Sequence, residues 1–282
     1  MTPVIFEQKG SRCDVLHNDR SHKIAEYDFH PRNQETVLLL HGWPLSHLMY
    51  EYQIGLLARL GYRVVALDLR GFGRSDAPAS GYHYDCMADD VCRVVQKLGL
   101  CRFTLVGFSM GGAIALRYMR RFRGAGVKKL ILLAAAAPCW VQRPDFPYGL
   151  PRSQADDLIR LAETDRPLLA QRFSHEQLFA SPQSEAAKDW FEDIALSASG
   201  LGTVQAAIAL RDEDGRCDLA AVQVPTFILH GAKDVVVSTA LAEIQQRGIR
   251  GAKRITLENS GHGIVYDELE RFNRLFLEVL RS

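Results

Sequence analysis

The chain has 282 residues, of which 47% are hydrophobic and 24% are charged, and its formal net charge is +1. This length suits one large domain, or one domain with an insertion, and the composition is that of an ordinary globular protein. The balanced charge gives no indication of nucleic acid or a membrane surface as a partner, and the longest apolar run, Leu130 to Ala137, is too short to span a membrane.

The N-terminus and the cysteines predict a cytoplasmic protein. Met1 to Gly10 contains the acidic Glu7 and no long apolar run, which is typical of neither a signal peptide nor a transit peptide. The six cysteines include no close Cys-x-x-Cys pair, so we expect reduced thiols rather than a zinc ribbon or a thioredoxin-like site.

Short apolar segments alternate with helical patterns, which predicts an α/β protein. Two early segments fit a hairpin at a sheet edge: residues 13–16 and 24–29. Six later runs are typical of buried parallel strands: residues 36–40, 63–67, 103–106, 129–133, 226–229 and 254–257. We therefore predict a mostly parallel, eight-stranded sheet flanked by helices.

Two helices between and after these strands have a clear apolar face. Val91, Val94, Val95 and Leu98 follow helical spacing, with Asp85 as the expected N-cap and Gly99 as the expected stop. An amphipathic C-terminal helix is predicted from Leu269 to Leu280. A group of arginines is expected to be a solvated helix end: Arg117, Arg120, Arg121 and Arg123.

The alternation of strands and helices stops between Pro138 and Asp218. This stretch contains several prolines and scattered aromatics, with helical patterns at residues 155–162 and 190–198. It predicts a helical cap insertion at residues 138–215, within an α/β core made of residues 1–137 and 216–282. We expect cap aromatics such as Trp140 to shape a substrate pocket, although large aromatics also fill cores.

The segment Gly107-Phe108-Ser109-Met110-Gly111 matches the G-x-S-x-G pattern of a nucleophile turn. An apolar strand precedes it and a helical run follows, which is the context that the pattern requires. The glycines allow other backbone to come close. Ser109 is therefore the predicted nucleophile.

A glycine turn, His41-Gly42-Trp43-Pro44, directly follows the strand at residues 36–40. Such a loop can aim a backbone N–H at the oxygen of a reacting carbonyl, and a second N–H would come from the residue after the nucleophile. Trp43 and Met110 are the predicted oxyanion-hole residues. We expect His41 to be structural.

A serine nucleophile needs a base, and the base needs a carboxylate to orient it. His262 is the predicted base, because it lies in a glycine-flanked loop between the last strand and the last helix. Asp234 is the predicted acid, since the alternative position after the strand at residues 129–133 contains only alanines. His230 and His175 are poorly placed to act as base, and five others are expected in loops or on the surface: His17, His22, His30, His47 and His83.

The loop Asp68-Leu69-Arg70-Gly71-Phe72-Gly73-Arg74 also follows a strand. We interpret it as structural, with Asp68 and either Arg70 or Arg74 holding it together.

With these motifs in place, the sequence resembles the carboxylesterase, aryl-esterase and cofactor-free haloperoxidase (perhydrolase) group of the α/β hydrolases. The matching segments are HGWPLSHLMYEYQ, DLRGFGRSD, VGFSMGG, HGAKDVVV and SGHG. The resemblance implies hydrolysis of a small ester or lactone through an acyl-enzyme, with no metal or organic cofactor. It places Trp43 and Met110 in the oxyanion hole and Val236 beside the acyl pocket.

Several alternatives stay open. A lactonase or a carbon–carbon bond hydrolase would use the same triad, peracid formation would be a side activity, and a ligand sensor of this fold would turn over slowly. Epoxide hydrolases and haloalkane dehalogenases have similar His-Gly-Trp-Pro loops, but they use an aspartate where this chain has Ser109. The sequence does not indicate an oligomeric state.

Overall fold

The structure, a computed structural model, describes residues 9–17, 20–29 and 35–282. One sheet has the strand order β1-β2-β4-β3-β5-β6-β7-β8. Its eight strands are β1 (Lys9–His17), β2 (Arg20–Phe29), β3 (Thr36–Leu40), β4 (Arg63–Leu67), β5 (Phe103–Phe108), β6 (Val127–Leu133), β7 (Thr226–Gly231) and β8 (Lys253–Leu257). Strands β3 to β8 run parallel, and β2 is antiparallel to β1 and β4. The predicted sheet and its edge hairpin are confirmed.

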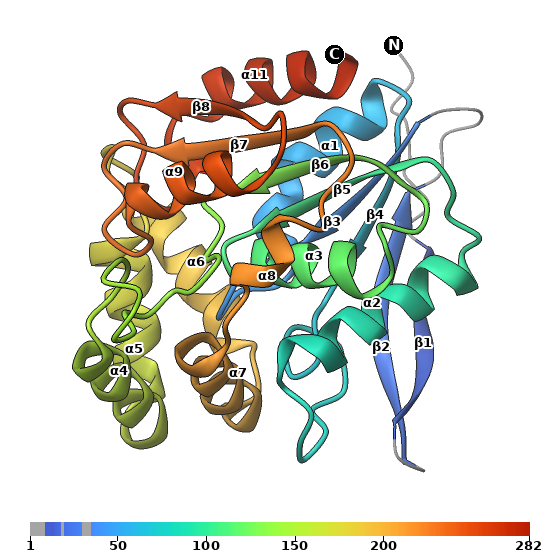
Figure 1. Ribbon diagram of the computed structural model, residues 1–282. Coiled ribbons are helices and arrows are strands. Elements are labelled where there is room, and N and C mark those ends of the chain that lie inside the picture. The colour runs from blue at the N-terminus through green and yellow to red at the C-terminus, as the bar shows by residue number, and fades with distance from the viewer. Residues whose placement is uncertain (1–8, 18–19, 30–34) are drawn as a thin grey trace.

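Helices cover both faces of this sheet (Figure 1). Each face of the sheet has its own apolar cluster, because successive side chains along a strand point to opposite faces. Leu38 and Leu40 belong to one cluster, and Val37 and Leu39 belong to the other. The first cluster includes residues of α2 (Tyr84–Lys97), α3 (Met110–Arg121) and α9 (Thr239–Gly248). The second includes residues of α1 (Glu51–Arg59) and α11 (Leu269–Arg281). Three short helical elements lie in the segments between these longer elements: a 3₁₀ turn (His47–Tyr50), α8 (Arg216–Leu219) and α10 (Ile264–Asp267).

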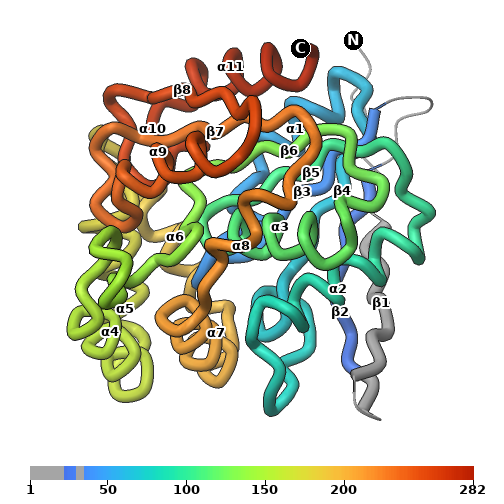
Figure 2. The backbone as a smooth tube through the Cα atoms, viewed as in Figure 1, coloured from blue at the N-terminus to red at the C-terminus, as the bar shows by residue number. Residues whose placement is uncertain are grey.

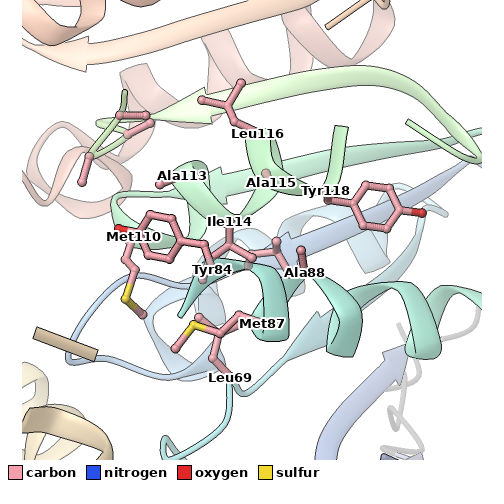
Figure 3. Packing of buried hydrophobic residues seen from close by; sticks show 14 of the residues in the cluster. Leu69, Tyr84, Met87, Ala88, Met110, Ala113, Ile114, Ala115, Leu116 and Tyr118 are labelled. Carbon is pink, nitrogen blue, oxygen red and sulfur yellow. The ribbon is translucent and has the colours of Figure 1, made fainter. Parts of the chain in front are cut away.

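Helices α2 and α3 pack closely against each other, and Figure 3 shows their buried alanine, isoleucine, methionine and tyrosine side chains. Ala88 of α2 and Ala113 and Ala115 of α3 are buried here. The predicted stop of α2 is confirmed, because Gly99 has a φ of 59° just after the helix. The predicted N-cap is wrong: His83 has extended backbone and accepts from Cys86 N, which leaves Asp85 in the first turn.

Between β6 and β7 the chain forms α4 (Arg152–Thr164), α5 (Arg166–Arg172), a π-helical turn (Phe173–Gln177), α6 (Glu185–Leu196) and α7 (Gly200–Asp212). We call these elements the insertion helices. The tube drawing shows them grouped together at one side of the sheet (Figure 2). The helix predicted at residues 190–198 begins earlier, because the Ser184 side chain caps α6 by accepting from Ala187 N.

The two ends of the insertion lie together and are tied to α3. The backbone N–H of Gly215 donates to the carbonyl of Pro138 over 2.8 Å. Arg117 of α3 is 8% exposed and pairs with Asp218, Asp85 and Glu213 over 2.6 to 3.1 Å. The prediction of a solvated helix end is therefore wrong for Arg117, whose charge is held among carboxylates.

Within the described ranges, no single helix is both long and apolar enough to cross a bilayer. Helices α6 and α7 meet those requirements only when taken together, and they are bent by 93° at the break between them. The cysteines whose side chains are described are all free: Cys86, Cys92, Cys101, Cys139 and Cys217. The expectation about a leader falls largely on residues 1–8, outside the described part of the chain.

Candidate active site

Ser109 lies on a strained turn between β5 and α3. Its φ of 51° is a region that side-chain-bearing residues rarely adopt, so surrounding bonds must hold it. Its N–H donates to the Leu133 carbonyl at 2.9 Å, and its own carbonyl accepts from Gly112 and Ala136 at 3.0 Å. A Cβ on Gly107 would come within 2.5 Å of the Gly111 carbonyl oxygen, so the turn needs glycine there.

The loops after β7 and β8 bring Asp234 and His262 together. His262 Nδ1 lies 2.8 Å from Asp234 Oδ2, and neither side chain is exposed to solvent. The His262 ring also packs on Phe108, the residue before Ser109, with 4.8 Å between ring centroids. His262 Nε2 is buried and has no hydrogen-bond partner within the described residues. The ring is therefore oriented through one nitrogen, with the other free.

Asp234 is held on both carboxylate oxygens. Oδ1 accepts from the backbone N–H groups of Val236 and Val237 at 2.8 Å. Oδ2 faces His262 and also lies 3.3 Å from His230 Nε2. Burial alone would raise the pKa of Asp234, but the two histidines and their hydrogen bonds hold that pKa well below its ordinary value. The carboxylate is thus ionised at neutral pH.

His230 is a supporting residue that the sequence analysis considered only as a base. It is the penultimate residue of β7 and is 1% exposed, and its Nε2 also lies 2.9 Å from the Val237 carbonyl. Its spacing of four residues from Asp234 could have indicated this role, since a strand end and the following turn commonly face each other.

The loop after β3 lies against the nucleophile. A Cβ on Gly42 would be 2.8 Å from Ser109 Cβ and 2.7 Å from Phe108 Cδ1, so the backbone at residues 42–43 passes directly beside Ser109. The Trp43 side chain is anchored elsewhere, because Nε1 donates to the Thr203 carbonyl of α7 at 2.9 Å. Met110 begins α3, where the first N–H groups have no partner inside the helix.

A cavity of about 580 Å³ opens between this loop and the insertion helices. Trp43, Trp140, Phe173 and Val236 line it, so both side chains predicted to contact substrate, Trp140 and Val236, face this space. They are also joined, since Trp140 Nε1 donates to the Val236 carbonyl at 2.9 Å. Phe173 lies 6.4 Å from the Trp43 ring and 6.5 Å from the His262 ring. The cavity thus adjoins the loops that carry the predicted site.

Asp267 ties the histidine loop to the insertion, a connection that the sequence analysis missed. Its carboxylate accepts the N–H groups of Gly261 at 2.6 Å, Ala180 at 2.9 Å and Ser181 at 2.8 Å. Gly263 N–H also donates to the Leu178 carbonyl at 2.6 Å. The residues on both sides of His262 are therefore bonded, directly or through one carboxylate, to residues 178–181.

His41 is fully buried and structural, as predicted. Its Nε2 accepts from Leu69 N–H at 2.9 Å, while Nδ1 lies 2.8 Å from the Gly42 carbonyl. This arrangement needs the neutral ring with the proton on Nδ1. Burial lowers the pKa of His41 to about 4. The His41 side chain thus links the Gly42 turn to the loop after β4.

Asp68 holds its loop through Arg74, whose backbone N–H donates to Oδ2 at 2.9 Å. Arg70 instead forms two bonds of 2.6 Å with Asp90. His47 is buried against Asp68 at 2.8 Å, and His22 is buried 3.3 Å from Asp90. His22 and His47 were predicted to lie in loops or on the surface, and the prediction is wrong about their exposure, because both side chains are buried. The side chains of His17 and His30 lie outside the described part of the chain.

One group of side chains in the described chain has the spacing of metal ligands: His175, Asp189 and Glu192. They come from the π-helical turn and α6, and their short contacts are those of ion pairs, with His175 Nε2 at 3.1 Å from Glu192 and 3.3 Å from Asp189. None of the three is a residue of the predicted site.

Comparison with known proteins agrees with this architecture. The family described as the alpha/beta hydrolase fold matches residues 35–269. The α/β-hydrolase superfamily protein YisY of Bacillus subtilis is 48% identical over 87% of this chain and 91% of its own. An esterase from Exiguobacterium antarcticum has a TM-score of 0.90 at 43% identity, covering 93% of this chain and 97% of its own. A bromoperoxidase from Bacillus anthracis has a TM-score of 0.92 at 30% identity, covering 97% and 100%.

Proposed function

The chain belongs to the α/β-hydrolase fold family, and on that premise we propose that it is a serine hydrolase that cleaves carboxylic esters of small to medium size. The observation that carries the proposal is the buried Asp234–His262 pair, whose imidazole ring packs on Phe108 of the strained Ser109 turn and whose Nε2 has no hydrogen-bond partner within the described residues. The likeness to an esterase of 43% identity supports the same reaction class.

In the first half of the reaction, His262 Nε2 takes the proton of the Ser109 hydroxyl as the oxygen attacks the ester carbonyl. The carbonyl oxygen becomes an oxyanion and accepts from the backbone N–H groups of Trp43 and Met110. Asp234 stabilises the imidazolium through Nδ1. The imidazolium then gives its proton to the leaving alcohol, and an acyl-Ser109 ester remains.

In the second half of the reaction, water takes the place of the alcohol and removes the acyl group from Ser109. His262 takes a proton from water as the water oxygen attacks the acyl carbonyl. When the tetrahedral intermediate collapses, the His262 imidazolium returns the proton to Ser109 Oγ and the carboxylic acid leaves. The 580 Å³ cavity beside Trp43 and Val236 is the proposed acyl site, because it adjoins the loop beside Ser109 and is lined largely by apolar side chains.

Hydrolysis of p-nitrophenyl esters of increasing acyl length tests this proposal. We expect turnover without added metal, and a loss of at least about a thousandfold in kcat for Ser109→Ala, because the nucleophile is gone. Ser153→Ala, which alters an exposed serine of α4, is the matched control and should keep full activity. Undiminished turnover by Ser109→Ala would refute the proposal.

The likeness to a bromoperoxidase favours a second reaction of the same acyl-enzyme. Hydrogen peroxide in place of water would attack acyl-Ser109 and release a peracid, and the peracid would oxidise bromide. Bromination of monochlorodimedone in acetate buffer with peroxide and bromide measures this activity. It should disappear in Ser109→Ala; bromination that persists in this variant would contradict the peracid route.

A further inference from the structure

Arg172 is the one arginine between residues 138 and 219, all of which the structure describes, that has no hydrogen bond or ion pair. The other six arginines of this stretch donate to carboxylates or backbone carbonyls: Arg143, Arg152, Arg160, Arg166, Arg211 and Arg216. A guanidinium without a partner keeps its full capacity to bind an anion. Arg172 therefore differs from its neighbours in having donors to offer a ligand.

The position of Arg172 connects it to the predicted site. It is the last residue of α5, and the next residue is Phe173, whose ring faces both His262 and Trp43. Arg172 and Phe173 line the same 580 Å³ cavity, together with Trp43 and Val236. One continuous space thus connects the loop beside Ser109 with the exposed guanidinium.

The charges along this cavity leave one cation uncompensated. Besides Arg172, its ionic lining residues are Arg160 and Asp157, which bind each other at 3.2 Å. Most of the other lining residues are apolar, with Trp43, Val236 and Leu169 among them. A ligand that fills the cavity therefore meets a mainly apolar lining and a single positive charge without an acidic partner.

We propose that Arg172 binds a carboxylate at the far end of the substrate's acyl chain, so that half-esters of dicarboxylic acids are preferred substrates. This inference rests on the proposed esterase function. The apolar chain would lie along the cavity wall, and the carboxylate would accept two parallel N–H bonds from the guanidinium fork. Because Arg172 is exposed, the preference is modest, about threefold to tenfold.

Paired substrates isolate this charge. Monomethyl and dimethyl suberate share one acyl chain and differ at its distal end, which carries a carboxylate in the first and a second methyl ester in the second. A pH-stat measures the initial rates of both at neutral pH, and the diester rate is divided by its two equivalent esters. We expect kcat/KM for the half-ester to exceed that for the diester. In Arg172→Gln the ratio should fall by about fivefold, chiefly through a higher KM for the half-ester. Arg152→Gln, which removes another exposed arginine outside the cavity, should keep the wild-type ratio.

The outcomes separate the two hypotheses. An unchanged ratio in Arg172→Gln, or a wild-type preference for the diester, would overturn the role of Arg172 while ester hydrolysis stands. Hydrolysis of neither methyl ester nor of any p-nitrophenyl ester would instead refute the proposed function. A wild-type preference that declines with added salt and disappears in Arg172→Gln supports a charge interaction.

Discussion

Ser109, Asp234 and His262 each depend on neighbours to hold an unfavourable state. Ser109 keeps a positive φ because backbone hydrogen bonds to its N–H and its carbonyl fix the turn. Asp234 keeps a buried charge because two N–H groups and two imidazoles surround it. His262 is bonded through Nδ1 only. At the residue scale, strain and charge are thus concentrated where the proposed chemistry occurs.

His41 makes stability depend on pH. Its pKa is about 4 in the folded protein, against an ordinary value of 6.5, so between these values the unfolded chain binds a proton that the folded chain does not. The free energy of unfolding should therefore be unaffected by His41 above pH 6.5 and decrease as the pH falls, by about 3 kcal/mol in all at pH 4. Urea unfolding at pH 7.5 and pH 5 measures the first part of this loss.

The control is His41→Gln, which keeps a polar side chain but cannot titrate. This variant should be less stable at pH 7.5, and its further loss on acidification to pH 5 should be about 2 kcal/mol smaller than that of the wild type. Identical pH dependence in the two proteins would show that His41 does not carry the effect.

At the scale of elements, Asp267 joins the histidine loop to the segment that follows the π-helical turn. Asp267→Ala removes both acceptor oxygens, so Gly261, Ala180 and Ser181 all lose their bonds. We expect kcat/KM for esters to fall by about 10- to 100-fold through misplacement of His262. Amide hydrogen exchange should rise at Gly261 and Ala180 together.

Glu270→Ala is the matched control, because this carboxylate is 92% exposed on the next helix. It should change neither kcat/KM nor exchange at these amides. Wild-type kcat/KM in Asp267→Ala would contradict the positioning role, and a loss of activity without faster exchange at Gly261 would do so as well.

Arg117 connects α3 to the end of the insertion. Its replacement by methionine leaves Asp218, which is 1% exposed, with only Arg120 at 3.2 Å. We expect a loss of about 3 kcal/mol in the free energy of unfolding, measured with urea, because a buried carboxylate loses its main partner. Arg121→Met removes an exposed arginine that pairs with Asp89, and it should cost about 1 kcal/mol or less. Equal effects of the two substitutions would contradict this account.

For the whole molecule, the local patterns in the sequence were sufficient for the sheet. Buried strands are continuous apolar runs, and the turn at Ser109 is recognisable from glycines between a strand and a helix, so each element carries its own signal. The parallel order then places the ends of β3, β5, β7 and β8 at one edge, which is why Trp43, Ser109, Asp234 and His262 could be grouped in advance.

The features that sequence analysis missed depend on distant partners. The bond between Arg117 and Asp218 joins residues 101 positions apart, and the bonds of Asp267 to residues 180 and 181 cross 86 and 87 positions. No local pattern encodes such pairs. The N-cap of α2 is a local feature that the sequence pattern left ambiguous. His83 and Asp85 are both able to cap, and only the path of the backbone selects His83. The burial of His22 and of His47 likewise depends on distant partners, Asp90 for His22 and Asp68 for His47.

The central claim is that Ser109 is the nucleophile of a hydrolase, and covalent labelling tests it most directly. The folded protein is treated with a fluorophosphonate, and the modified residue is located by mass spectrometry of its peptides, with Ser109→Ala as the control. We predict one adduct per chain, on Ser109, and none in the variant. An adduct on a different residue, or equal labelling of Ser109→Ala, would contradict the account.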